Sequence, residues 1–146
     1  MRPLHPEYRK LLLPYGGVIQ QLALAARKLI LEEAPEASEF VYEVYTIADH
    51  FTFTERPSDA FVFTTTHANW VNLGFNFGST LPDPEGLLQG NGKWIRHVRI
   101  ATDDRSGGAW CSTVAKSGYL TSRAAPNQSH EAEYYDTQGS IRREAV

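Results

Sequence analysis

Hydrophobic residues near the start of the chain recur at steps of three and four positions. This spacing places them on one face of a helix, and the polar residues between them fall mainly on the other face. The apolar positions are Val18, Ile19, Leu22, Ala26, Leu29 and Ile30. Pro35 ends the helix near Ala34, because a residue before proline avoids the α region. The pattern therefore predicts an amphipathic helix over residues 16–34 that packs on a core.

From residue 40 onward the hydrophobic period changes to two, which is typical of β-strands. The runs with this period are 40–47, 51–54, 61–64, 71–77 and 94–100. Turns are expected at 48–50, 56–59 and 67–69. Short connections imply antiparallel neighbours, because a parallel pair needs a crossover of about a dozen residues or more. We therefore predict an α+β fold, a two-layer sandwich in which the helix covers a mainly antiparallel sheet of roughly five or six strands.

Alternation also assigns residues to the two faces of the predicted sheet. In the last strand, Val98 and Ile100 fall on one face with Arg96. His97 and Arg99 fall on the other face. Most of the aromatic residues are expected to face the core, in the set Phe51, Phe53, Phe61, Phe63, Phe75 and Phe77. The opposite face carries Trp70, Asn72 and Asn76, which form a candidate ligand-facing wall.

The remaining segments carry weaker patterns. Residues 1–15 are rich in proline and are expected to be irregular. Residues 106–125 could hold a weaker C-terminal helix around Trp110, although glycines make it a poor one. Residues 126–146 are polar, and we expect a tail that is disordered or loosely attached. The predicted organisation is one domain over residues 16–125 between these two flanking segments.

Composition narrows the class of protein. The 146 residues fit one domain, and the net charge of −3 is too small to favour a nucleic-acid partner. The single cysteine, Cys111, cannot form an intramolecular disulfide, so a secreted disulfide scaffold is excluded. No apolar stretch resembles a signal peptide or reaches the roughly 20 residues of a membrane span. We therefore expect a cytoplasmic protein with no membrane partner.

The most specific motif lies in residues 81–100. It reads LPDPEGLL, then GNGK, then RHVRI. This string resembles the signature of the YdhG-like family of small bacterial domains, and the helix end LILEEAPEA is also similar to that family. The resemblance covers residues 18–100 and implies a helix packed on an antiparallel sheet. Some members are labelled frataxin-like iron chaperones, so the resemblance implies iron handling as one alternative.

A glycine-rich turn inside this motif is the leading candidate for a binding site. Its residues are Gly90, Gly92, Lys93, Arg96 and His97. Glycines allow successive backbone N–H groups to converge on an anion. Lys93 could add charge, and Arg96 could add a planar fork for carboxylate or phosphate. The alternative is a tight turn into an edge strand with solvated basic side chains.

A stretch rich in carboxylates suggests a second kind of site. It contains Glu32, Glu33, Glu36, Glu39, Glu43, Asp49 and Glu55, with no lysine or arginine among them. Grouped carboxylates could hold a hard cation weakly, and His50 and His67 could add nitrogen ligands. The alternative is a solvated helix end followed by outward-facing strand positions. No spacing here matches a closed metal site, so no residue is assigned as a metal ligand.

Catalysis has no convincing sequence signal. Cys111 could act as a nucleophile only with a nearby base, and we expect it to be a small packing residue. We therefore predict a non-enzymatic binding domain for a small anionic ligand or a metal ion, with no assigned catalytic residue. Two alternatives stay open: a frataxin-like iron-binding protein, and an enzyme of unknown type. The sequence identifies neither a cofactor nor an oligomeric state.

Overall fold

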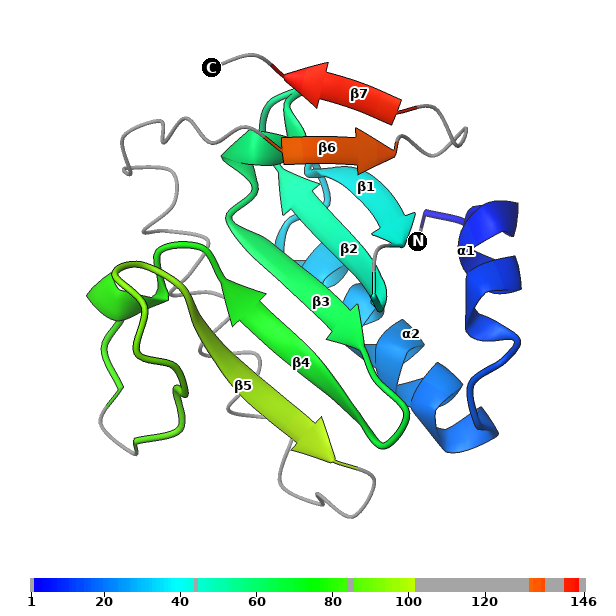
Figure 1. Cartoon of the computed structure of the whole chain (residues 1–146), viewed down its shortest axis with the longest axis horizontal. Coiled ribbons are helices and arrows are strands. Elements are labelled where there is room, and N and C mark those ends of the chain that lie inside the picture. Colours follow the sequence, from blue (N-terminus) through cyan, green and yellow to red (C-terminus); the bar gives the residue numbers. More distant parts are fainter. Residues whose placement is uncertain (1, 44, 84–85, 102–131, 136–140, 145–146) are drawn as a thin grey trace.

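The computed structural model of the protein describes residues 2–43, 45–83, 86–101, 132–135 and 141–144. Two helices precede a five-stranded sheet of strand order β1-β2-β3-β4-β5, and all neighbouring strands are antiparallel (Figure 1). The elements are α1 (Pro6–Leu12), α2 (Gly17–Glu33), β1 (Ser38–Glu43), β2 (Ile47–Thr52), β3 (Val62–Thr66), β4 (Trp70–Phe75) and β5 (Arg96–Ala101). The predicted α+β fold with its N-terminal helix and antiparallel sheet is confirmed.

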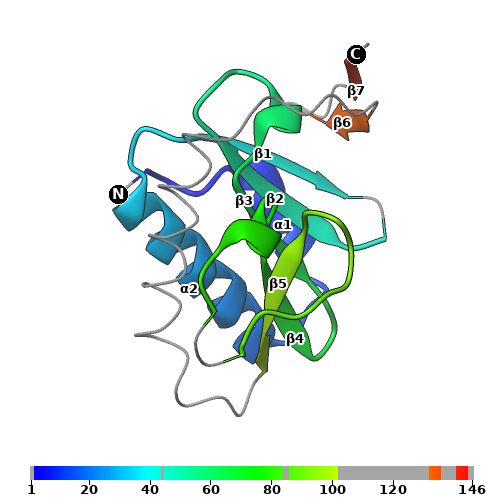
Figure 2. The ribbon, with the colours of Figure 1, turned by 90° about the vertical axis from the view of Figure 1, so that its left-hand side faces the viewer.

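Among the described residues, α1 and α2 cover one face of the sheet, and no helix covers the other, which carries Phe63, Asn72 and Arg99 and is called the open face. Helix α2 lies along one side of the sheet, on the left in Figure 2. Two groups of apolar side chains fill the space between them, one around Phe51 and Leu73 and one around Tyr8 and Val71. Leu22 packs against both groups. The core is therefore one layer between α1, α2 and a single face of the sheet.

Helix α1 corrects the expectation that residues 1–15 are irregular. Pro6 stands in the first turn, where proline is tolerated because the missing N–H has no partner inside the helix anyway. The ring nitrogen Nδ1 of His5 accepts a hydrogen bond from the Glu7 backbone N–H at 3.2 Å and caps the helix. Tyr8 and Leu12 are buried against α2 and the sheet. Pro6 thus marks the start of a helix, although the high proline content of residues 1–15 suggested an irregular segment.

Two strand predictions were wrong in detail. Residues 48–50, expected to form a turn, lie within β2, and the chain turns before Ile47 instead. Phe63, expected in the core, lies on the open face, because β3 begins at Val62 and turns Val62 and Thr64 toward the helix. Both errors have one cause: Asp49 and Thr64 are polar and yet buried.

Two connections lie at the same end of the sheet, because alternate connections of an antiparallel sheet share one end. Strands β4 and β5 are joined by a long loop with the 3₁₀ turn η2 (Gly78–Thr80), and the Asp83 carboxylate accepts hydrogen bonds from the Leu87 and Leu88 N–H groups. Strands β2 and β3 are joined through the 3₁₀ turn η1 (Pro57–Asp59). The long loop therefore positions the motif at residues 90–97.

Part of the predicted organisation falls outside the described residues. The weaker helix considered at 106–125 and Cys111 both lie there. Within 126–146 the structure describes only β6 (Ala132–Tyr135) and β7 (Ile141–Glu144), which pair antiparallel. The loosely attached tail stays a prediction. Among the described helices, none is long and apolar enough to cross a membrane.

Candidate functional site

The glycine-rich turn forms a loop that is tied to the rest of the fold. The Ser79 backbone N–H donates to the Trp94 carbonyl, and the Ser79 hydroxyl donates to the Lys93 carbonyl, both at 2.9 Å. Gly90 has a φ of +120°, a conformation that side chains disfavour. The backbone carbonyl groups of the loop thus accept hydrogen bonds that fix its shape, while the Lys93 side chain is exposed to solvent.

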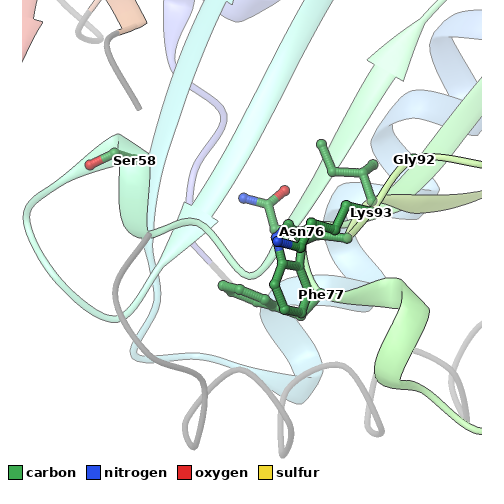
Figure 3. Close-up of a pocket in the computed structure, with 7 residues that line it drawn as sticks. Ser58, Asn76, Phe77, Gly92 and Lys93 are labelled. Carbon is green, nitrogen blue, oxygen red and sulfur yellow. The ribbon is translucent and has the colours of Figure 1, made fainter. Parts of the chain in front are cut away.

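Beside this loop lies a pocket of about 240 Å³, which we call the β5-loop pocket (Figure 3). It is lined by Ser58, Asn76, Phe77, Gly92, Lys93, Trp94 and Ile95. Phe77 and Trp94 meet edge to face with ring centroids 6.2 Å apart. The Lys93 Nζ lies 5.3 Å from the centre of the Trp94 ring, within the range of a cation–π contact. The pocket therefore combines an aromatic wall with one cation.

The structure does not bring the predicted anion-binding residues together in one place. Gly92 and Lys93 line the β5-loop pocket. Arg96 folds back on the loop, and its guanidinium donates to the Gly92 carbonyl at 2.6 Å and to the Ile95 carbonyl at 2.7 Å. Gly90 supplies the positive φ of the turn, where an added Cβ atom would lie 3.3 Å from the Ile95 carbonyl oxygen. The guanidinium N–H groups of Arg96 thus stabilise the loop, whereas the sequence analysis expected them to bind a ligand.

His97 lies on the open face, where it joins a second group of side chains. We call this group the open-face cluster, and its members are His67, Trp70, Asn72, His97 and Arg99. The Arg99 guanidinium carbon lies 4.1 Å from the centre of the Trp70 ring. The His67 ring stacks on Trp70 with centroids 4.8 Å apart and planes at 18°. Trp70 thereby fixes both basic side chains.

Hydrogen bonds indicate which ring nitrogen of His67 carries the proton. The Asn72 Nδ2 group lies 3.3 Å from His67 Nε2, and the Thr65 hydroxyl lies 3.0 Å from the same nitrogen. An amide NH₂ group can only donate, so His67 Nε2 accepts. In the neutral ring the proton then sits on Nδ1, which is left as a donor. The cluster therefore presents an imidazole N–H as well as a guanidinium.

The electrostatics of the open-face cluster keep its histidines neutral. Partial burial, together with the charge of Arg99, lowers the pKa of His67 and the pKa of His97. Further across the open face, burial lowers the pKa of His50 to about 4, and the Tyr42 hydroxyl bonds its Nε2 at 2.6 Å. Arg99 is therefore the fixed positive charge of the cluster.

The acidic residues considered as a metal site do not share one surface. Glu39 forms an ion pair with the buried Arg27, whose Nε lies 2.6 Å from Glu39 Oε1. Asp49 is fully buried on the covered face of the sheet. Glu32 is exposed and pairs with Lys28 at 3.7 Å. Within the part of the chain that the structure describes, no group of three or more histidine, cysteine or acidic residues could hold a metal ion.

Comparisons of the chain with protein-family models, with curated proteins and with solved structures returned no match.

Arg99 of the open-face cluster was not among the predicted site residues, and His67 was considered only as a possible nitrogen ligand for a cation. The sequence pattern already placed Trp70 and Asn72 together on one face, and His97 and Arg99 together on one face. What was missing was the register, which pairs Asn72 with Arg99 and Gly74 with His97. A prediction of the β4–β5 pairing would have found the cluster.

Proposed function

We propose that this protein is a non-enzymatic binding domain for a small anionic ligand with an apolar body, held in the β5-loop pocket. One observation carries the proposal: Lys93 stands at a pocket with aromatic walls and has no carboxylate partner among the described residues. The volume of about 240 Å³ is below the roughly 300–1,000 Å³ of drug-sized sites. The ligand is therefore small.

The loop is suited to this role because its shape does not depend on a ligand. Arg96 and Ser79 hold the backbone at residues 92–95 through four hydrogen bonds to carbonyl groups. A pocket that is already formed loses less conformational entropy when a ligand binds. Lys93 would pair with the anionic group, while Phe77 and Trp94 would contact the apolar body.

A titration with benzoate tests this proposal. We expect saturable binding by calorimetry, and a change in tryptophan fluorescence because Trp94 lines the pocket. Lys93→Gln should weaken binding about twofold to fivefold, since an exposed ion pair contributes up to about 1 kcal/mol. Lys93→Arg should retain most of the affinity.

The matched control is Lys28→Gln, which removes the same charge from the exposed side of α2. This variant should bind benzoate as the wild type does. Benzyl alcohol, which lacks the charge, should bind more weakly than benzoate. The proposal is wrong if benzoate does not saturate, or if Lys93→Gln and the wild type bind it equally.

We further propose that the protein is a cytoplasmic member of the YdhG-like family, on the strength of the motif at residues 81–100. The iron-binding alternative that this resemblance implies has its own test. If the protein binds small anions and not iron, titration with ferrous iron should show no saturable binding. Saturable binding that is lost when Glu32 and Glu36 become glutamine would support the alternative instead.

A further inference from the structure

The open face of the sheet has an unusual distribution of charge. Within the described strands its residues are Ser38, Phe40, Tyr42, Ala48, His50, Thr52, Phe63, Thr65, Trp70, Asn72, Gly74, His97, Arg99 and Ala101. None of these side chains is a carboxylate, whereas Glu39 and Asp49 lie on the covered face. Arg99 is exposed and forms no ion pair with any described residue. This face therefore favours an anion.

The open-face cluster also contains polar atoms that lack partners. The Trp70 indole Nε1 and the Asn72 Oδ1 are shielded from solvent, and neither has a hydrogen-bond partner among the described residues. Shielded polar groups are nearly always hydrogen-bonded, because an unmade bond costs free energy. A ligand with donors and acceptors, or an ordered water beneath it, would satisfy them.

The donors of the cluster match the oxygens of a phosphate group. The Arg99 guanidinium lies over the Trp70 ring, which restricts where its planar fork can go, and a guanidinium can bind two oxygens at once. His67 retains an Nδ1–H donor, because its Nε2 accepts from Asn72. His97 lies on the same face of β5, two residues before Arg99. Three donor groups from β5 and the β3–β4 turn thus belong to one cluster.

We propose that the open-face cluster binds the phosphate group of a small ligand, with Arg99 as its charged fork and His67 and His97 as imidazole donors. This site differs from the β5-loop pocket and does not rest on it. A bound phosphate offsets the positive charge of Arg99, so both imidazoles take up protons more readily. The titratable and charged groups that face them are Arg99 and each other, with His50 and Tyr42 further across the sheet.

The test is a titration of the intact protein with inorganic phosphate, followed through the histidine ring signals in NMR spectra. His67→Gln and His97→Gln assign the two signals. Phosphate should raise the pKa of each ring by about one unit, because one unit corresponds to about a tenfold difference in phosphate affinity between its protonation states. Binding should therefore be stronger at lower pH, above the second pKa of phosphate near 6.

Variants of Arg99 test whether phosphate binds at the open-face cluster. Arg99→Gln should weaken phosphate binding at least tenfold, and Arg99→Lys should restore only part of it, since lysine lacks the planar fork. Arg99 is exposed, so these variants should fold, and circular dichroism checks this. Arg9→Gln, which removes the same charge from the exposed side of α1, should bind phosphate as the wild type does.

A comparison of two probes distinguishes free phosphate from an organic phosphate. If phenyl phosphate binds more tightly than inorganic phosphate, the ligand is an organic phosphate whose ring contacts the aromatic residues of the open face. If the two bind equally, the cluster recognises the phosphate group alone. Both outcomes support the site. The proposal is overturned if neither imidazole pKa responds to phosphate, or if Arg9→Gln weakens binding as much as Arg99→Gln. Loss of benzoate binding in Lys93→Gln leaves these outcomes unchanged.

Discussion

Gly74 shows how one absent side chain shapes the open face. A Cβ atom at this position would lie 2.1 Å from the Phe63 ring, far closer than van der Waals contact. The ring therefore lies over the β4 backbone, and it also stacks with His50 at a centroid distance of 5.0 Å. The aromatic row across β2 and β3 depends on a glycine in the middle of β4, where glycine otherwise weakens a strand.

Substitution of this glycine tests that contact. Gly74→Ala should lower the free energy of unfolding by about 1–3 kcal/mol, as overpacking does in a crowded site. Urea denaturation measures the loss. In a Phe63→Ala background the same substitution should cost little or be stabilising, because alanine loses less backbone entropy than glycine. An equal loss in both backgrounds would show that the ring contact is not the cause.

At the scale of elements, a layer of polar groups joins α2 to β1 and β2. Arg27 of α2 donates to Glu39 of β1 through Nε at 2.6 Å and through Nη2 at 3.0 Å. Asp49 of β2 is fully buried beside this pair. Burial, followed by the charge of Glu39, raises the pKa of Asp49 well above its usual value. The helix is thus fastened to the sheet by a charged pair next to a carboxyl group that favours its neutral form.

Replacement of that carboxyl group should change how stability depends on pH. The folded pKa of Asp49 is raised, so above the unfolded value of about 3.9 the folded state retains a proton that the unfolded state has lost. Stability from this group is present at low pH and is lost as the pH rises through the folded pKa. Asp49→Asn stays neutral, and its stability relative to the wild type should increase as the pH rises.

Urea denaturation between about pH 4 and about pH 8 measures this difference. The control is Glu55→Gln, which removes an exposed carboxylate and should leave the pH dependence of the wild type in place. Parallel pH profiles for Asp49→Asn and the wild type would contradict the inferred burial of a neutral carboxyl group.

At the scale of the whole molecule, the two core groups behave as parts of one core. The first group contains Phe51 and Leu73, and the second contains Tyr8 and Val71. Leu22 of α2 contacts both groups, and α2 contributes buried residues to each. Such a core should unfold in one cooperative transition, as small single domains usually do.

Leu22→Ala tests this coupling. We expect it to lower the free energy of unfolding by about 2–4 kcal/mol, through lost burial and the cavity left behind. Far-ultraviolet circular dichroism and tryptophan fluorescence should still report one midpoint. Leu24→Ala makes the same change on the exposed side of α2 and should alter stability by less than about 1 kcal/mol. Separate midpoints by the two probes would mean that the groups unfold independently.

The ligand proposals need the whole fold, because each site joins residues from distant segments. The β5-loop pocket combines Ser58 from η1 with Asn76 and Lys93. The open-face cluster combines His67 and Trp70 with Arg99. The sequence indicated Lys93 and His97 as residues of one site, whereas the structure places Lys93 at the β5-loop pocket and His97 on the open face.

The sequence by itself determined the fold class, the bounds of α2 and the faces of β5, since apolar periodicity and turn residues act locally. Helix α1, the phase of β3 and the position of β2 were decided by the tertiary structure. The polar residues Asp49 and Thr64 are buried because segments far along the chain pack over them, and a local pattern does not indicate such burial. Strand register likewise decided the open-face cluster, because it brings Arg99 beside Asn72. Pairing between strands depends on long-range packing, which local patterns do not encode.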